Sequence, residues 1–189
     1  AKPRCIDLTF ADRYSVCILG ASAILSATPH TFERLVSDFY NDTYLMDQNA
    51  CSSPHLVIWC GSLEEIGNAK LKFWEALQKL VDEKYGLTDV AAIDKYTHLL
   101  ALITQYDFLS VKVASSNLLY RVELSDLHFN PRFLKGNRGF FVEVTDTDYD
   151  GFLGIIEDSF QTVTYYGIDV QKLATRITKA GTTGVDRIV

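Results

Sequence analysis

One cysteine in this chain has a setting that suits chemistry. Cys51 lies in the polar run of residues 47–54 (DQNACSSP), directly before an apolar stretch. Cys17 and Cys60 lie inside apolar runs, where a thiol behaves as a small hydrophobic group. Cys51 stands instead between a predicted helix and a predicted interior strand, where exposed backbone N–H groups favour a thiolate and can hold an oxyanion. These features make Cys51 a candidate catalytic thiol, with a half-buried loop cysteine as the alternative.

A catalytic thiol usually needs a neighbouring base or an electropositive site. Four histidines are candidates, and no spacing to Cys51 singles one out. His55 is near in sequence but follows a proline, and His128 borders a loop from which it could face a site or the core. His30 precedes a predicted helix, where capping is typical, and His98 lies in a helical pattern that indicates a partly buried structural residue. A cysteine–histidine hydrolase therefore stays open as an alternative.

Composition limits the classes of protein and of site. No two cysteines are spaced as CxxC and no two histidines have a metal-ligand spacing, so we expect no metal site. The four cysteines, Cys5 included, could form two disulfides by number alone, but a chain of 189 residues that is 48% hydrophobic does not need them. We expect free thiols and a cytoplasmic protein, without a secretory signal or a membrane span. The net charge of -6 argues against nucleic acid as the main partner.

Apolar periodicity predicts an alternating α/β order of elements. Residues 108–114 and 118–124 alternate on either side of the turn 115–117, which predicts a β-hairpin. Further strands are expected over residues 16–19, 56–60, 140–144, 162–165 and near 185, and helices over 28–42, 68–85, 88–105, 149–158 and 170–179.

The two longest predicted helices each have an apolar face. Gly86 follows the first of them as a plausible C-cap. The inward residues are expected to be Leu71, Trp74, Leu77, Leu80 and Val81 in helix 68–85, and Ala91, Tyr96, Leu99, Leu100 and Ile103 in helix 88–105.

Residues 47–54, followed by the strand from residue 56, resemble the nucleophile segment of the LuxC-type long-chain acyl-CoA reductases of bacterial bioluminescence. That family is a branch of the aldehyde dehydrogenase superfamily. Residues 162–169 (TVTYYGID) and 184–189 (GVDRIV) resemble its C-terminal part, in the family's order. The resemblance implies an α/β fold, namely an aldehyde-dehydrogenase-like catalytic lobe with a mostly parallel sheet flanked by helices and a β-hairpin extension.

The resemblance also implies a thioester mechanism. Cys51 would take a fatty acyl group from acyl-CoA or an acyl-protein, and NADPH would reduce the thioester to a long-chain aldehyde for luminescence. The implied partners are the acyl-protein synthetase and acyl-transferase subunits of a fatty acid reductase complex, together with further copies in a homo-oligomer. The aromatic residues could line an acyl tunnel, although most of them are expected in the core.

The chain departs from the family's pattern in its cofactor site. No GxGxxG follows a strand, and only about fifty residues precede Cys51, so the dinucleotide-binding lobe is expected to be largely absent from a single catalytic-lobe domain over residues 1–189. We therefore expect a fragment that accepts acyl groups poorly and is inactive alone. Glu143 is the candidate for contacting the nicotinamide ribose, and Arg138 is interpreted as a surface cation. Alternatives are a cysteine acyltransferase or thioesterase without nicotinamide, and a non-catalytic oligomerisation module.

Overall fold

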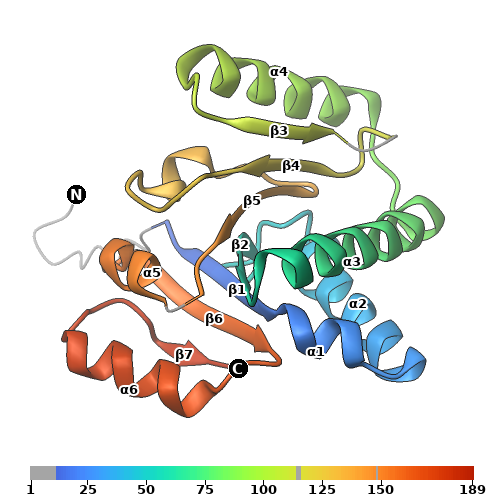
Figure 1. The fold of residues 1–189 in the computed structure, drawn as a ribbon. Helices are drawn as coiled ribbons and strands as arrows, with labels where there is room; N and C mark the ends of the chain where they lie inside the picture. Colours follow the sequence, from blue (N-terminus) through green and yellow to red (C-terminus); the bar gives the residue numbers. More distant parts are fainter. Residues whose placement is uncertain (1–11, 114–115, 148) are drawn as a thin grey trace, which may run out of the picture.

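The computed structural model describes residues 12–113, 116–147 and 149–189 (Figure 1). The strands are β1 (Tyr14–Gly20), β2 (Pro54–Cys60), β3 (Ser110–Val113), β4 (Tyr120–Glu123), β5 (Phe140–Thr145), β6 (Phe160–Tyr166) and β7 (Arg187–Ile188). The helices are α1 (Ala21–Ser26), α2 (Pro29–Thr43), α3 (Leu63–Lys84), α4 (Asp89–Gln105), α5 (Asp150–Ile155) and α6 (Val170–Ala180), with a 3₁₀ turn at Pro131–Leu134.

All seven strands form one sheet in the order β3-β4-β5-β2-β1-β6-β7. Neighbouring strands are parallel, except that β3 and β4 are an antiparallel hairpin. The predicted α/β fold, with its mostly parallel sheet, flanking helices and hairpin, is thereby confirmed. The predicted hairpin turn includes Ser115, which lies outside the described residues.

The sheet is covered on both faces, as parallel sheets are in α/β proteins. In Figure 1, α1, α2 and α3 lie on one side of the central strands, while α5 and α6 lie on the other. Side chains alternate accordingly: in β2, Val57 and Trp59 join the core under α1–α3, while Leu56 and Ile58 join the opposite core. Both faces of β1 and β2 are thus buried, which explains their continuous apolar sequence.

Helix α3 starts earlier than its apolar pattern predicts, at Leu63. Ser62 caps it, because its Oγ accepts from the Glu65 backbone N–H while the Glu65 carboxylate accepts from the Ser62 N–H. The prediction for Leu71 is wrong, since its side chain is 60% exposed. The Gly86 prediction is also wrong, because the C-cap is Tyr85 in an extended conformation.

Helix α4 is rotated relative to its predicted face. Tyr96, Leu100 and Ile103 were expected inward and are exposed, while Leu102 is buried. Lys95 is buried as well, because its ammonium finds hydrogen-bond acceptors on the hairpin side of the helix. The sheet beneath α4, rather than the local apolar count, therefore sets which residues face inward.

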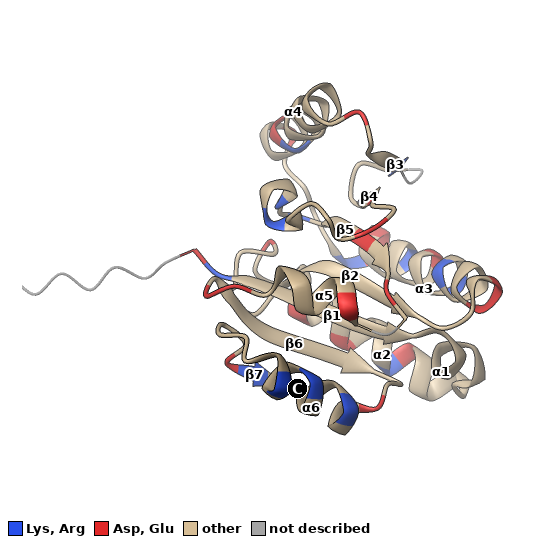
Figure 2. Ribbon diagram, turned by 60° about the vertical axis from the view of Figure 1, so that its left-hand side comes forward, with Lys and Arg blue, Asp and Glu red and all other residues tan. Residues whose placement is uncertain are grey.

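Charged residues lie mainly on helices and loops, and strands β1, β2 and β6 carry none (Figure 2). Glu143 in β5 is the exception among the central strands. No helix in the described part of the chain is long and apolar enough to cross a membrane.

Candidate active site

Cys51 lies in an exposed turn between α2 and β2, at the end of the sheet where β1 and β2 begin. Its backbone carbonyl accepts a hydrogen bond from Ser15 Oγ in β1 at 2.7 Å, and the Ser53 N–H donates to the Ala50 carbonyl at 2.9 Å. Among described residues, the backbone N–H groups of Cys51 and Ser52 have no acceptor. The turn therefore presents an exposed thiol on a backbone that is held by the Ser15 and Ser53 hydrogen bonds.

The other described cysteines differ from Cys51 in burial. Cys17 and Cys60 are buried in strands and form no disulfide with another described cysteine, as predicted, and burial raises the pKa of the Cys17 thiol to about 12. Cys5 lies outside the described residues. Cys51 is thus the accessible thiol of the described part of the chain, and its catalytic role stays a prediction.

Gln48 holds the Cys51 turn to the start of β5. Its side chain is fully buried, and Nε2 donates to the carbonyls of Pro54 at 3.0 Å and Phe140 at 2.9 Å. Its Oε1 accepts from the backbone N–H groups of Gly139 and Phe140, both at 3.0 Å. These four bonds tie together both sides of the turn and the neighbouring loop. No pattern in a single sequence distinguishes this glutamine from a surface residue.

Asp47, next to Gln48, adds further hydrogen bonds that hold the turn. Asp47 and Gln48 have positive φ angles of 52° and 60°, which the tight turn requires. The Asp47 carbonyl accepts from the Arg138 N–H at 3.0 Å, and its carboxylate accepts from the Tyr85 hydroxyl at 2.6 Å. The turn is therefore anchored to the end of α3 as well as to the loop before β5.

Lys95 of α4 fixes that loop from the other side. Its ammonium donates to the carbonyls of Asn117 at 2.9 Å and Arg138 at 2.7 Å, and lies 4.5 Å from the centre of the Tyr120 ring. Burial, the main cause, lowers its pKa to about 7, with a smaller effect from the Arg138 charge. Lys95 lies four residues from both Ala91 and Leu99, on the same face of the helix. A lysine on this apolar face is the sequence signal that could have indicated its burial.

None of the four histidines forms a hydrogen bond with Cys51 in the described structure. His30 and His128 are exposed, and His98 is half-buried in α4. His55 is only 2% exposed and stacks on the Tyr14 ring at 5.7 Å, and burial lowers its pKa to about 4. The structure therefore brings no imidazole to the thiol as a paired base.

Glu143 lies inside β5 and is 1% exposed. Its Oε2 accepts from the indole N–H groups of Trp59 and Trp74, both at 3.0 Å, and its Oε1 accepts from Arg121 at 3.1 Å. Lys70 lies 3.8 Å from the same carboxylate. These three hydrogen bonds and the burial of the carboxylate place Glu143 at the centre of a polar cluster inside the lobe. The cofactor role of Glu143 stays a prediction.

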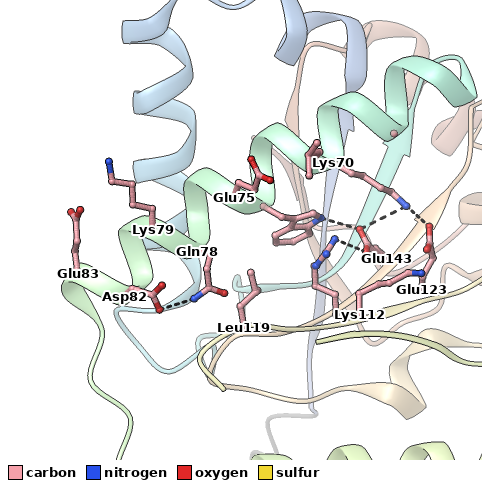
Figure 3. A pocket seen from close by; sticks show the side chains of 14 residues that line it. Lys70, Glu75, Gln78, Lys79, Asp82, Glu83, Lys112, Leu119, Glu123 and Glu143 are labelled. Atoms are coloured by element: carbon pink, nitrogen blue, oxygen red, sulfur yellow. Dashed lines mark hydrogen bonds and ion pairs between the residues drawn. The ribbon is translucent and has the colours of Figure 1, made fainter. Parts of the chain in front are cut away.

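The Glu143 cluster forms one end of a groove of about 720 Å³ between α3 and the β3–β4 hairpin. Figure 3 shows Lys70 and Gln78 of α3 pointing toward the hairpin side, where Leu119 and Lys112 lie, while Lys79 points away from it. Leu71, Trp74 and Leu119 are the large apolar residues of the groove's lining. This groove is separate from the Cys51 turn, and none of the residues of the turn lines it.

The structure is similar to solved aldehyde dehydrogenases. The matches include betaine aldehyde dehydrogenase from Staphylococcus aureus (14% identity, TM-score 0.54, 93% of this chain and 38% of that one). An aldehyde dehydrogenase from Bartonella henselae matches with 10% identity and a TM-score of 0.53, over 93% of this chain and 39% of that one. The 1-pyrroline-5-carboxylate dehydrogenase from Thermus, solved with bound NAD, matches with 11% identity and a TM-score of 0.53. The match covers 94% of this chain and 36% of that one.

These similarities show an aldehyde-dehydrogenase-like fold, and the chain spans less than two fifths of the length of those enzymes. No protein-family model matches the chain, and no curated protein sequence matches it.

Proposed function

We propose that this chain is the thiol-bearing lobe of an oxidoreductase that converts a fatty acyl thioester into a long-chain aldehyde. The observation that carries the proposal is the exposed Cys51 thiol on a braced turn, in a fold shared with aldehyde dehydrogenases. The similarity of residues 47–54 to the LuxC-type nucleophile segment supports the acyl thioester as substrate and luminescence as its use.

The chemistry starts with attack of the Cys51 thiolate on the carbonyl carbon of acyl-CoA or an acyl-protein. The carbonyl oxygen takes the negative charge, and the free N–H groups of Cys51 and Ser52 stabilise it. Collapse of this tetrahedral species expels the donor's thiolate and leaves the acyl group on Sγ. The exchange is nearly balanced in energy, because one thioester replaces another.

A nicotinamide cofactor, NADPH in this proposal, would supply a hydride to the acyl carbon. Gln48, Ser15 and Asp47 of this chain keep the turn in one conformation, so that the acyl carbon stays in one place. Departure of the aldehyde then returns the Cys51 thiolate. Glu143 remains the predicted contact with the nicotinamide ribose, and we assign no further residue of this chain to the cofactor.

The remaining enzyme parts belong to the proposal too. Since the chain spans less than two fifths of the enzymes it resembles, a cofactor-binding lobe is proposed as its complement. Acyl-protein synthetase and acyl-transferase subunits are the proposed suppliers of the acyl group, in a cytoplasmic complex, and further copies are expected in a homo-oligomer.

The test is a stoichiometric acylation. The chain is incubated for hours with tetradecanoyl-CoA, quenched in acid and mapped by peptide mass spectrometry. The expected result is slow formation of one thioester adduct, on Cys51, which Cys51→Ala abolishes and Cys60→Ala leaves in place. Addition of NADPH to the chain alone should release no aldehyde.

Other outcomes identify the alternatives. Rapid release of free tetradecanoic acid, dependent on Cys51, would indicate a thioesterase. Absence of any adduct, with Cys51 no more reactive to iodoacetamide than a free cysteine peptide, would contradict the nucleophile and leave a non-catalytic oligomerisation module. Micromolar NADPH affinity with turnover would contradict the need for a second lobe.

A further inference from the structure

A polar cavity of about 480 Å³ adjoins the Cys51 turn. It lies between the start of β2, helix α4 and the loop before β5. Asn49, two residues before Cys51, lines the cavity. The Asn49 Oδ1 accepts a hydrogen bond from Asn137 Nδ2 at 3.1 Å. The charged and imidazole side chains in its lining are Asp12, His55, Lys95, His98, Lys135 and Arg138, with the exposed Asp94 as a seventh.

The lining is cationic although the chain carries a net charge of -6. Lys135 donates to Asp12 at 2.7 Å, so these two charges compensate each other. The Arg138 guanidinium forms no hydrogen bond or ion pair with any described residue. Lys95 uses two of its three N–H donors on backbone carbonyls and keeps the third. The cavity thus holds one full cation with unused donors, Arg138, and Lys95, whose pKa of about 7 leaves it partly charged at neutral pH, together with one exposed carboxylate.

Two imidazole nitrogens in the lining are buried without a partner: His55 Nδ1 and His98 Nε2. Buried polar groups in folded proteins are nearly always hydrogen-bonded, so an unpaired one indicates a partner that binds from outside. His55 is 2% exposed, and its ring is held in place by the Tyr14 stack. His55 lines the cavity beside Gly136, so a ligand or water there could complete the hydrogen bonding of its ring.

We propose that this cavity binds a phosphate ester, with Arg138 as the charged donor and Lys95, His55 and His98 as further hydrogen-bonding groups. Guanidinium and ammonium groups form their strongest hydrogen bonds with phosphate oxygens. Two phosphate-bearing ligands are consistent with its place beside Cys51: the diphosphate of a CoA acyl donor and the 2′-phosphate of NADPH. That the bound phosphate belongs to a reactant of Cys51 rests on the proposed function.

The test measures equilibrium binding by calorimetry in the full chain carrying Cys51→Ala, which prevents reaction at that thiol. The probes are desulfo-CoA, 2′,5′-ADP and inorganic pyrophosphate. Arg138→Gln should raise the Kd of the bound probe about tenfold or more, as loss of a charge-assisted contact does. Lys79→Gln, in the separate α3 groove, is the matched control and should leave Kd unchanged.

The preferred probe identifies the source of the phosphate. Tighter binding of desulfo-CoA than of 2′,5′-ADP assigns the cavity to the acyl donor, and the reverse order assigns it to the dinucleotide. If Arg138→Gln lowers the Tm, His98→Gln serves instead and should weaken binding at least threefold.

The proposal is overturned if no probe saturates, or if Arg138→Gln and Lys79→Gln weaken binding equally, which would indicate general charge screening. Phosphate binding is measured in the chain that lacks the Cys51 thiol. Phosphate binding can therefore be absent although the native chain forms the acyl adduct, and the adduct can be absent although phosphate binds. The two proposals are therefore tested separately.

Discussion

At the scale of single residues, Gln48 shows how a buried amide can brace an exposed nucleophile. Both donors of Nε2 and both acceptor positions of Oε1 are used on backbone groups. Two of those partners belong to Phe140 and one to Gly139, so the turn and the loop before β5 move as one unit. The thiol is exposed, but the backbone that holds it is rigid.

Replacing Gln48 by leucine should destabilise the protein by about 3 kcal/mol, because several buried backbone groups lose their partners at once. Urea unfolding at pH 7 measures this. Gln78→Leu is the control, since Gln78 bonds only to the side chains of Asp82 and Ser116, and should cost under about 1 kcal/mol. Equal costs for the two variants would show that the Gln48 bonds do not support the turn.

Glu143 is the second residue-scale case. Glu143→Gln keeps the shape of the side chain but leaves Arg121 without its countercharge, while Lys70 keeps Glu123; the loss should cost roughly 3 kcal/mol. Glu75→Gln, exposed in the same groove, should stay within about 0.5 kcal/mol by urea unfolding. A variant that unfolds normally but loses NADPH affinity in the complete enzyme would establish the cofactor role instead.

At the scale of secondary-structure elements, caps and tertiary contacts decide what apolar spacing alone leaves open. The α3 sequence ahead of residue 68 is weakly apolar, yet the Ser62 cap starts the helix there. In α4, the apolar residues form more than one possible inward row. The carbonyls of Asn117 and Arg138 select the row that contains Lys95.

Ser62→Ala should lower the free energy of unfolding by about 1 kcal/mol, because the first turn of α3 loses an N-cap acceptor. Thermal unfolding followed by circular dichroism measures the change. Ser22→Ala, on the exposed side of α1, should change stability by less than about 0.5 kcal/mol. A Ser62 variant as stable as the Ser22 variant would mean that packing alone starts α3.

At the scale of the whole molecule, the buried His55 couples folding to pH. Burial lowers its pKa to about 4 in the folded protein, whereas an unfolded histidine has a pKa near 6.5. Between these two pKa values, His55 binds a proton in the unfolded chain but not in the folded chain. This contribution to stability is therefore present above about pH 6.5 and is lost as the pH falls toward 4.

We expect the loss from this residue to reach roughly 3 kcal/mol across that interval. Urea unfolding at pH 7, 6, 5 and 4.5 measures the slope for the native chain and for His55→Gln. The variant keeps every other titrating group, so its stability should fall less steeply over this range. Parallel curves for the two proteins would show that His55 titrates normally.

The sequence by itself determined the order of strands and helices except for the short helix α1, the α/β class and the cysteine that stands apart. Val16–Leu19 and Leu56–Cys60 are apolar at every position, and only a strand buried on both faces accommodates such a run. Cys51 was distinguishable because its neighbours are polar and small. These are local properties, and local chain geometry follows from them.

The tertiary structure alone decided which residues surround that cysteine. Gln48 meets Phe140, and Lys95 meets Arg138, across long stretches of chain, and the imidazoles of His55 and His98 line the same cavity. Hydrogen bonds and charge act over a few ångströms in space, whatever the distance along the chain. Cys51 could therefore be identified from its neighbours in sequence, whereas its supports and the cavity beside it required the packed sheet.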